Sequence, residues 1–267
     1  MGVVNVTPDS FSDGGAYLDP QAAIAHGLAL AAAGAAIIDV GGESTRPGAE
    51  PVAADEELRR VVGVVSELAA RAHVPVSIDT TKAVVAQAAL DAGAVMVNDV
   101  SGGTADPDLL GVVVRAGAAF VAMHTRGTPR TMQQQADYTD VVREVGDALH
   151  DRVARAIEAG VDARALLADP GIGFAKTIDH NVALLRALPE IAARVGAPLL
   201  VGASRKSFLG RIAGADLLAR DDATLATTIW CFEQGATLVR VHDVASSRRA
   251  VELLEVMERA TPEGMAA

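Results

Sequence analysis

Short apolar runs that end on a polar residue recur along the whole chain. In one case Gly34 follows an alanine-rich helical stretch and leads into Ile37-Ile38-Asp39; in another, Gly235 leads into Leu238-Val239-Arg240-Val241-His242. Glycine is favoured just after a helix, and short aliphatic runs are typical of parallel strands that are covered on both faces. The pattern therefore predicts repeated units of helix, glycine turn and buried strand.

Eight such runs can be counted, with helical stretches between them. The expected strands are 2–6, 36–41, 74–79, 94–99, 118–124, 165–169, 198–203 and 236–242, and the expected helices are 20–33, 53–71, 81–92, 106–116, 139–159, 179–195, 221–234 and 246–260. Eight consecutive units predict an α/β protein, a single (β/α)8 TIM barrel over residues 1–267. An open doubly wound sheet has similar content, but no dinucleotide glycine motif follows the first strand, which favours the barrel.

Composition narrows the possible partners and the compartment. The net charge of −11 disfavours nucleic acid and anionic membranes as partners. Cys231 is the only cysteine, so it cannot form an internal disulfide, which fits a reducing compartment. No leader-like segment opens the chain, and no apolar stretch reaches the ~20 residues that span a bilayer. We therefore expect a cytoplasmic protein.

Polar residues gather where the predicted strands end, which is where barrel enzymes carry their active sites. Strand alternation makes Arg240 and His242 point together, and likewise Ser77 and Asp79. Any one of these residues could simply cap a turn, but the whole set in so aliphatic a chain predicts a binding site. Asp39 is the weakest member, because two glycines follow it and it could only brace the loop. The full set is Asn5, Asp39, Asp79, Asn98, His124, Asp169, the Ser204-Arg205-Lys206 turn, Arg240 and His242.

Two kinds of chemistry are represented in this set. The acceptors of Asp79, Asn98 and Asp169 suit a heterocycle rich in N–H donors. The cations Lys206 and Arg240, with His242, suit a phosphate group. A ring of residues that is half acidic and half basic thus predicts one ligand with both a donor-rich ring and an anionic group.

Both basic residues also have a purely structural interpretation. Lys206 could be a solvated residue at the start of a helix, and Arg240 could form an ion pair with Asp99 or Asp243. The hydrogen-bond and ion-pair partners of the two side chains distinguish the structural interpretation from the binding-site interpretation.

Three long loops follow predicted strands. The loops 7–15 and 41–49 are rich in Gly, Pro, Ser and charge, so we expect them to be mobile lids that close over a substrate. Ordinary surface loops are the alternative. The third, 125–137, contains Gln133-Gln134-Gln135, which we expect to be solvated.

Seven segments together resemble the motifs of a known family. They are NVTPDSFSDGG at 5–15, DVGGESTRPG at 39–48, SIDT at 77–80, NDVSG at 98–102, DPGIGF at 169–174, GASRKS at 202–207 and RVHD at 240–243. In this order they resemble the dihydropteroate synthases, the sulfonamide-target enzymes of folate biosynthesis. The likeness covers nearly the whole chain.

The resemblance implies a transferase that condenses 6-hydroxymethyl-7,8-dihydropterin diphosphate with 4-aminobenzoate. The products would be 7,8-dihydropteroate and diphosphate, formed by a dissociative path without a covalent protein intermediate. It also implies a homodimer, and Mg2+ bound to the diphosphate and to Asn5. By motif, Asp79, Asn98, Asp169 and Lys206 would hold the pterin, and Asn5, Arg240 and His242 would hold the diphosphate. Thr45, Arg46, Pro47, Phe174 and Ser207 would form the aminobenzoate side, and Met123 would be a further substrate-binding residue. Asp13, Arg46 and Lys206 would be catalytic.

Three other functions remain open at this point. A catalytically silent pterin-binding relative would be expected to lose motif residues, and none of the strand-end set is lost here. A methyltetrahydrofolate-binding methyltransferase domain shares the barrel and the pterin site but has no need for Arg240, His242 or the Ser-Thr-Arg-Pro loop. A sugar-phosphate barrel enzyme would not need the Asp79, Asn98 and Asp169 set.

Overall fold

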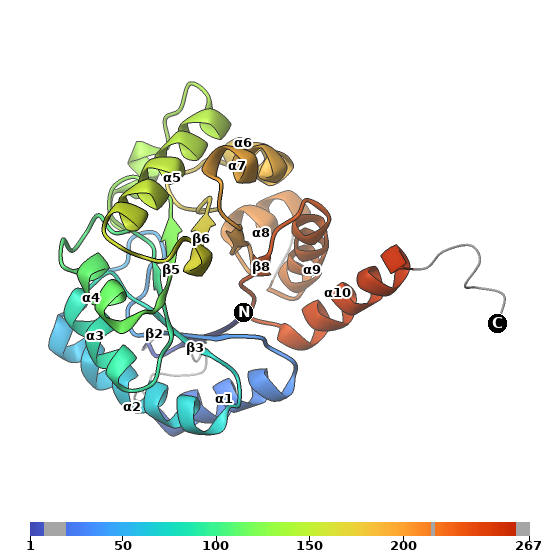
Figure 1. The fold of residues 1–267 in the computed structure, drawn as a ribbon. Coiled ribbons are helices and arrows are strands. Elements are labelled where there is room, and N and C mark those ends of the chain that lie inside the picture. Colours follow the sequence, from blue (N-terminus) through green and yellow to red (C-terminus); the bar gives the residue numbers. More distant parts are fainter. Residues whose placement is uncertain (8–19, 215–216, 260–267) are drawn as a thin grey trace.

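A computed structural model describes residues 1–7, 20–214 and 217–259, and within these ranges parallel strands form a ring surrounded by helices (Figure 1). The strands are β1 (Gly2–Asn5), β2 (Ile38–Gly41), β3 (Val76–Asp79), β4 (Met96–Asp99), β5 (Ala119–Met123), β6 (Leu166–Asp169), β7 (Leu200–Val201) and β8 (Leu238–Val239). The helices are α1 (Pro20–Ala32), α2 (Ala54–Arg71), α3 (Ala83–Asp91), α4 (Leu109–Ala116), α5 (Val141–Glu158), α6 (Ile178–Arg186), α7 (Leu188–Val195), α8 (Ser207–Ala213), α9 (Leu217–Glu233) and α10 (Val244–Arg259), with 3-10 turns η1 (Met132–Gln135) and η2 (Ala163–Ala165).

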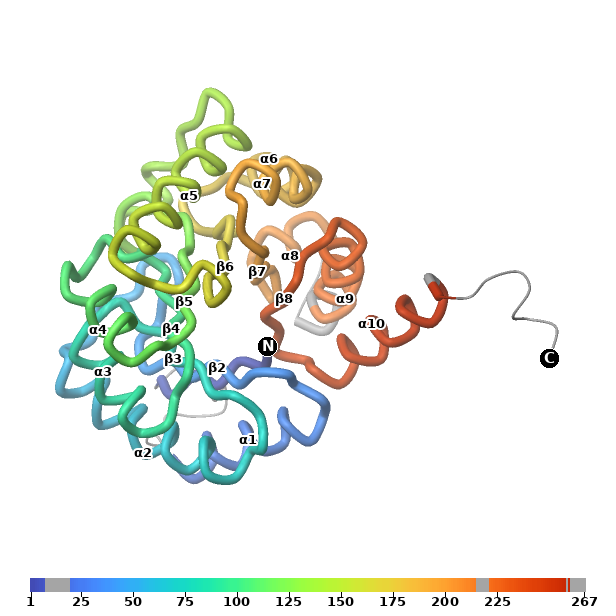
Figure 2. The backbone as a smooth tube through the Cα atoms, viewed as in Figure 1, coloured from blue at the N-terminus to red at the C-terminus, as the bar shows by residue number. Residues whose placement is uncertain are grey.

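The ring closes through two single parallel bridges. Strands β1 to β6 form one sheet in sequence order, and β7 pairs with β8. Ala168 on β6 bridges to Leu199, just before β7, and Gly2 on β1 bridges to Val241, just after β8. The backbone trace shows the same closed circuit (Figure 2). The predicted (β/α)8 barrel is confirmed.

The strand register explains why polar residues meet at one end of the barrel. Asp79 lies opposite Gly41 on β2 and opposite Asn98 on β4. Below this end, Met96, two positions before Asn98, packs with Val121 and Leu200 in an apolar cluster. The interior therefore changes from apolar to polar toward the carboxyl ends of the strands.

The helix predicted over 179–195 is divided into α6 and α7, which is a correction. Pro189 lies in the first turn of α7 and has no N–H to continue the hydrogen-bond ladder. The carbonyl of Leu185, which an uninterrupted helix would have used, accepts a hydrogen bond from Trp230 Nε1 on α9 at 2.8 Å. Helix α8 was also not predicted as a separate element, and it fills the connection between β7 and α9.

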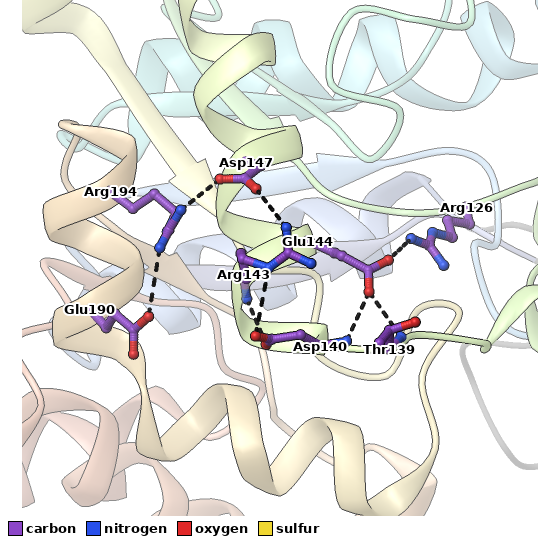
Figure 3. Close-up of polar contacts among 8 residues, drawn as sticks. All are labelled: Arg126, Thr139, Asp140, Arg143, Glu144, Asp147, Glu190 and Arg194. Carbon is purple, nitrogen blue, oxygen red and sulfur yellow. Dashed lines mark hydrogen bonds and ion pairs between the residues drawn. The ribbon is translucent and has the colours of Figure 1, made fainter.

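Surface ion pairs fix the start of α5 against its neighbours (Figure 3). Arg126, which follows β5, pairs with Glu144 at 2.8 Å, and Asp147 on the same helix pairs with Arg194 of α7 at 2.7 Å. Exposed pairs of this kind each contribute little free energy, about 0–1 kcal/mol. Their effect here is to orient α5, whose N-cap Asp140 accepts from the Arg143 amide at 3.1 Å.

Candidate active site

Arg240 lies at the centre of a charged network inside the polar end of the barrel. Its Nε donates to Asp39 Oδ2 at 2.6 Å and its Nη2 donates to Asp79 Oδ2 at 2.8 Å. Asn98 Nδ2 also donates to Asp39 Oδ2, at 3.0 Å. Asp39 is fully buried, and its Oδ1 has no hydrogen-bond partner within the described residues. One guanidinium and one shared carboxylate thus join three strands, β2, β3 and β4, to the segment after β8.

This network corrects two expectations from the sequence. Asp39, which could have braced only its loop, is instead the shared acceptor of Arg240 and Asn98. The alternative partners considered for Arg240 are engaged elsewhere: Asp99 accepts from Ser101 N at 2.7 Å, and Asp243 accepts from Ser246 N at 3.0 Å at the start of α10.

Asp169 faces the same interior from β6. It is buried, and its Oδ1 accepts a hydrogen bond from Gly171 N at 2.7 Å, which starts the turn that follows the strand. A side chain at Gly202 would contact Arg240 Cβ at 3.6 Å and Asp169 Oδ2 at 4.0 Å. Glycine at 202 therefore leaves open the space that separates the acidic residue from the basic one.

The turn after Asp169 depends on glycine at position 171. Gly171 has a φ of +66°, and a Cβ there would lie 1.9 Å from the carbonyl oxygen of His124. We expect Gly171→Ala to lower the free energy of unfolding by at least about 2 kcal/mol, because both backbone strain and a clash with fixed backbone result.

Gly196→Ala is the matched control for that prediction. Gly196 also has a positive φ, +72°, but a Cβ there meets nothing within 4 Å. Its cost should be limited to about 1 kcal/mol of backbone strain. Urea unfolding of both variants measures the difference, and equal midpoints would show that the contact with His124 relaxes freely.

Lys206 and Phe174 form one wall beside Asp169. Lys206 is the N-cap residue of α8, and its Nζ donates to the carbonyl of Ile172 and lies 4.5 Å from the centre of the Phe174 ring. Burial lowers the pKa of Lys206 to about 8, although the charge of Asp169 opposes the shift. The interpretation of Lys206 as a merely solvated residue is therefore wrong.

Lys176 is a buried lysine that the sequence did not identify. It is 4% exposed, and its Nζ donates to the Phe174 carbonyl at 2.8 Å and lies 3.1 Å from Nδ1 of His124. Burial lowers its pKa well below the usual range, and burial also lowers the pKa of His124 to about 2. A neutral His124 ring can accept the hydrogen bond from Lys176. A signal was available, because the chain has only three lysines: Lys82, Lys176 and Lys206.

His242 is oriented by Ser204, which follows β7. The His242 Nδ1 and Ser204 Oγ atoms lie 2.9 Å apart, and the same hydroxyl accepts from His242 N at 3.2 Å. Burial, followed by the charges of Arg240, Arg205 and Arg46, lowers the pKa of His242 to about 4. Its ring is therefore neutral at neutral pH. Arg205 pairs with Asp221 at 2.7 Å, so its guanidinium is directed toward α9.

The remaining predicted residues lie around this network. Asn5 ends β1 and is half-buried, and Met123 ends β5 opposite Asp169 and is buried. Arg46 and Pro47 are exposed on the β2–α2 loop, as is Ser207 at the start of α8. Asp13 lies outside the described residues, as do residues 8–15 of the loop that we predicted to be the first lid.

The loop after β5 contacts the turn that carries Phe174. Residues Met132–Gln135 form η1, and Gln133 Nε2 donates to the Gly173 carbonyl at 3.2 Å. Gln133, Gln134 and Gln135 are all exposed, so the expectation that this run is solvated is confirmed.

A family model described as pterin binding enzyme matches residues 1–242. The chain belongs to the pterin-binding enzyme family. The dihydropteroate synthase of Mycobacterium leprae is 53% identical over 98% of this chain and 94% of its own length, and that of Escherichia coli K12 is 42% identical over 96% and 90%. The resemblance seen in the sequence is confirmed.

Solved structures of the pterin-binding enzyme family agree. A Xanthomonas albilineans dihydropteroate synthase with 4-aminobenzoic acid superposes with a TM-score of 0.91 at 44% identity, covering 98% of this chain and 93% of the other. A Yersinia pestis dihydropteroate synthase with a sulfonamide drug complex gives 0.92 at 40% identity, covering 97% and 94%. A second Xanthomonas albilineans structure, in complex with 7,8-dihydropteroate, gives 0.87 at 40% identity, covering 98% and 94%.

The described residues offer neither a ready-made metal centre nor a membrane-spanning helix. Within 1–7, 20–214 and 217–259, no group of three or more His, Cys, Asp or Glu side chains is arranged to hold a metal ion. Over the same ranges, no helix has both the length and the apolar character needed to cross a bilayer.

Proposed function

We propose that this chain is a dihydropteroate synthase, a transferase of folate biosynthesis. It condenses 6-hydroxymethyl-7,8-dihydropterin diphosphate with 4-aminobenzoate to give 7,8-dihydropteroate and diphosphate. The observation that carries the proposal is the buried arrangement of Asp79, Asn98 and Asp169 around Arg240. Dihydropteroate synthases of 40–53% identity over nearly the full length support it.

The acidic residues suit the pterin. A dihydropterin presents several N–H donors along its pyrimidinone edge, and one carboxylate can accept two of them. Asp169 Oδ1 is occupied by the Gly171 amide, which leaves Oδ2 directed toward the open side of Gly202. Because these acceptors are buried, a ligand without matching donors would leave them unpaired and be rejected. Lys206 and Met123, on either side of Asp169, complete the pterin site.

The basic residues suit the diphosphate. Arg240 presents a planar fork that matches phosphate oxygens, and His242 is held beside it by Ser204. Stabilisation of the departing diphosphate is the main electrostatic task, because its charge grows as the bond to the pterin methylene breaks. The resulting cation is conjugated with the ring, and the amine of 4-aminobenzoate attacks it directly. No protein nucleophile is required.

Mg2+ fits this half of the site as a partner of the diphosphate. The ion prefers oxygen ligands and keeps several waters, so one protein oxygen together with phosphate oxygens is sufficient. Asn5 ends β1 beside Gly41, where its amide oxygen can serve in this way. When bound, the ion neutralises charge on the leaving group.

The aminobenzoate side is assigned to the β2–α2 loop and to residues around Lys206. Thr45, Arg46 and Pro47 lie on the β2–α2 loop, and Phe174 lies over Lys206. Ser207 begins α8 directly after Lys206. Arg46, Asp13 and Lys206 are assigned catalytic roles.

Diphosphate release from the pterin diphosphate, measured with and without 4-aminobenzoate and Mg2+, tests the proposal. We expect release only when both are present. Pterin binding without turnover would instead identify a catalytically silent relative. Methyl transfer from methyltetrahydrofolate in the same preparation would identify the methyltransferase class.

The free protein should bind the pterin substrate best between pH about 7 and about 8. Burial raises the pKa of Asp79 to about 7; Arg240 opposes this shift, and Asp39, Glu57 and Asp99 add to it. Below that pH, Asp79 gains a proton and cannot accept two N–H donors. Above pH about 8, Lys206, which faces Asp169, Arg240 and Asp79, loses its charge. A pH profile of kcat/KM for the pterin diphosphate tests the expected fall on both sides of this range. Asp79→Asn should remove the fall on the acidic side.

Assembly and location complete the proposal. We infer a homodimer, because α10 extends from the barrel (Figure 1) and exposes Leu253, Val256 and Met257 by 60–65%. Light scattering of the wild type and of Val256→Glu tests this.

We also infer that residues 1–267 are one domain, since the family model reaches residue 242 and α10 packs against α9. The buried thiol of Cys231 is consistent with a cytoplasmic location.

A further inference from the structure

The base of the β2–α2 loop is held by a charge cluster made of Glu43, Lys82 and Glu57. Lys82 Nζ donates to Glu43 Oε2, and to Glu57 Oε2 at 2.5 Å. Glu57 is in the first turn of α2 and is fully buried, while Lys82 is the N-cap residue of α3. One ammonium group therefore connects a loop residue with the starts of two helices.

Glu43 also closes the loop on itself. Its Oε2 contacts Lys82, and its Oε1 accepts a hydrogen bond from Val52 N at 3.2 Å. A single carboxylate thus joins the two ends of the segment 43–52 and fixes both to the barrel. The Gly42 carbonyl, next to this point, accepts from Arg60 of α2 at 2.8 Å.

The Glu43–Lys82–Glu57 cluster is largely shielded from water. The side chains of Glu43 and Lys82 are 20% and 23% exposed, and Glu57 is not exposed. Charge-assisted hydrogen bonds in such surroundings are stronger and more directional than those on an open surface. The cluster therefore anchors the base of the β2–α2 loop to the barrel. On the far side of the loop, Gly48 N donates a hydrogen bond to Pro129 O at 3.0 Å.

The cluster serves one half of the site only. The residues between its two ends include Thr45, Arg46 and Pro47, which the proposed function assigns to 4-aminobenzoate. Among the described residues, Glu43 forms no hydrogen bond or ion pair with Asp169 or Arg240, which are held by the Gly171 amide and by Asp39 respectively.

We propose that Glu43 is a positioning residue for the second substrate, and that Lys82 holds it in place. Through the segment 44–51 it sets where Thr45 and Arg46 meet 4-aminobenzoate, and it leaves the pterin site unaffected. This inference rests on the proposed function.

Glu43→Ala is the variant of choice, because it removes the fastening and leaves the buried Lys82–Glu57 pair intact. We expect KM for 4-aminobenzoate to rise by about tenfold or more, since small misplacement of a binding loop is costly. The Kd for the pterin diphosphate should stay within about twofold of the wild type. Glu43→Gln, which keeps an acceptor for Val52 N but loses the charge, should fall between. Lys82→Arg, which keeps the charge, should be much closer to the wild type than Lys82→Met.

Arg71→Met is the matched control, because it breaks an exposed ion pair with Glu67 at the far end of α2. Both constants should be unchanged in it. Equal losses for the two substrates in Glu43→Ala, or an unaltered KM, would overturn the inference. If the wild type shows no turnover, the proposed function fails. The fastening is then still measurable, because hydrogen exchange of the segment 44–52 should be faster in Glu43→Ala than in the control, and equal rates would refute it.

Discussion

Asp169→Asn is expected to reduce pterin affinity by about a hundredfold or more, with the fold retained. Asn keeps an oxygen that can accept from Gly171 N, so the turn is preserved. Its amide NH2 then replaces the carboxylate oxygen that faces the ligand. The N–H donors of the pterin therefore face an N–H donor of the side chain instead of an acceptor. Loss of a charge-assisted hydrogen bond in a buried site costs about 1.5–3 kcal/mol, and two N–H groups of the ligand are affected. Calorimetric titration with the bare pterin measures the change.

Asp162→Asn is a suitable control, because the Asp162 carboxylate lies before β6 and forms an exposed ion pair with Arg164. It should bind the pterin like the wild type. Near-normal affinity of Asp169→Asn would show that the pocket has been misplaced. The denaturation midpoint of each variant should be recorded as well, because a loss of fold would otherwise imitate a loss of binding.

Arg240→Met should be the most damaging single change, because it affects both stability and catalysis. It leaves Asp39 and Asp79 buried without their cation. Removing one partner from a buried ion pair costs about 3–5 kcal/mol. Turnover should fall by about a hundredfold or more, because the diphosphate loses its donor fork. Urea unfolding and diphosphate release measure the two effects.

Two comparisons separate these effects. The double variant Asp39→Asn with Arg240→Met should recover part of the lost stability, since one unpaired charge is removed, but it should recover no activity. Affinity for the bare pterin should suffer far less than affinity for its diphosphate. Equal losses for both ligands would contradict the assignment of Arg240. Arg248→Met, which breaks an exposed pair with Glu252, is the matched control.

The sequence was sufficient for the barrel and for the side of each strand that faces inward. Strand alternation alone placed Arg240 with His242, and the register confirms that Asp79 and Asn98 are neighbours. Which carboxylate pairs with Arg240 could not be predicted in this way. The answer depends on how far each strand is shifted against the next around the closed ring, and that shift left Asp39 within reach of Arg240 and Asn98.

Two further features depend on backbone geometry that the residue types do not predict. Ala175 has a φ of +51°, which few L residues adopt, and the next residue, Lys176, is buried beneath the turn. Lys176 lies in the connection before the helix predicted at 179–195, and nothing in its residue type or position predicts its burial. The division between α6 and α7 was signalled by Pro189, but a proline in a first helical turn and one that breaks a helix look alike in sequence.

The bond from Trp230 to the Leu185 carbonyl has a practical consequence. Trp230 is the only tryptophan in the chain, and it is 44% exposed on the outer helix layer. Its indole therefore serves as a single intrinsic fluorophore placed at the break between α6 and α7. A shift of its emission to longer wavelength would report the separation of α9 from α6, which makes unfolding observable without any label.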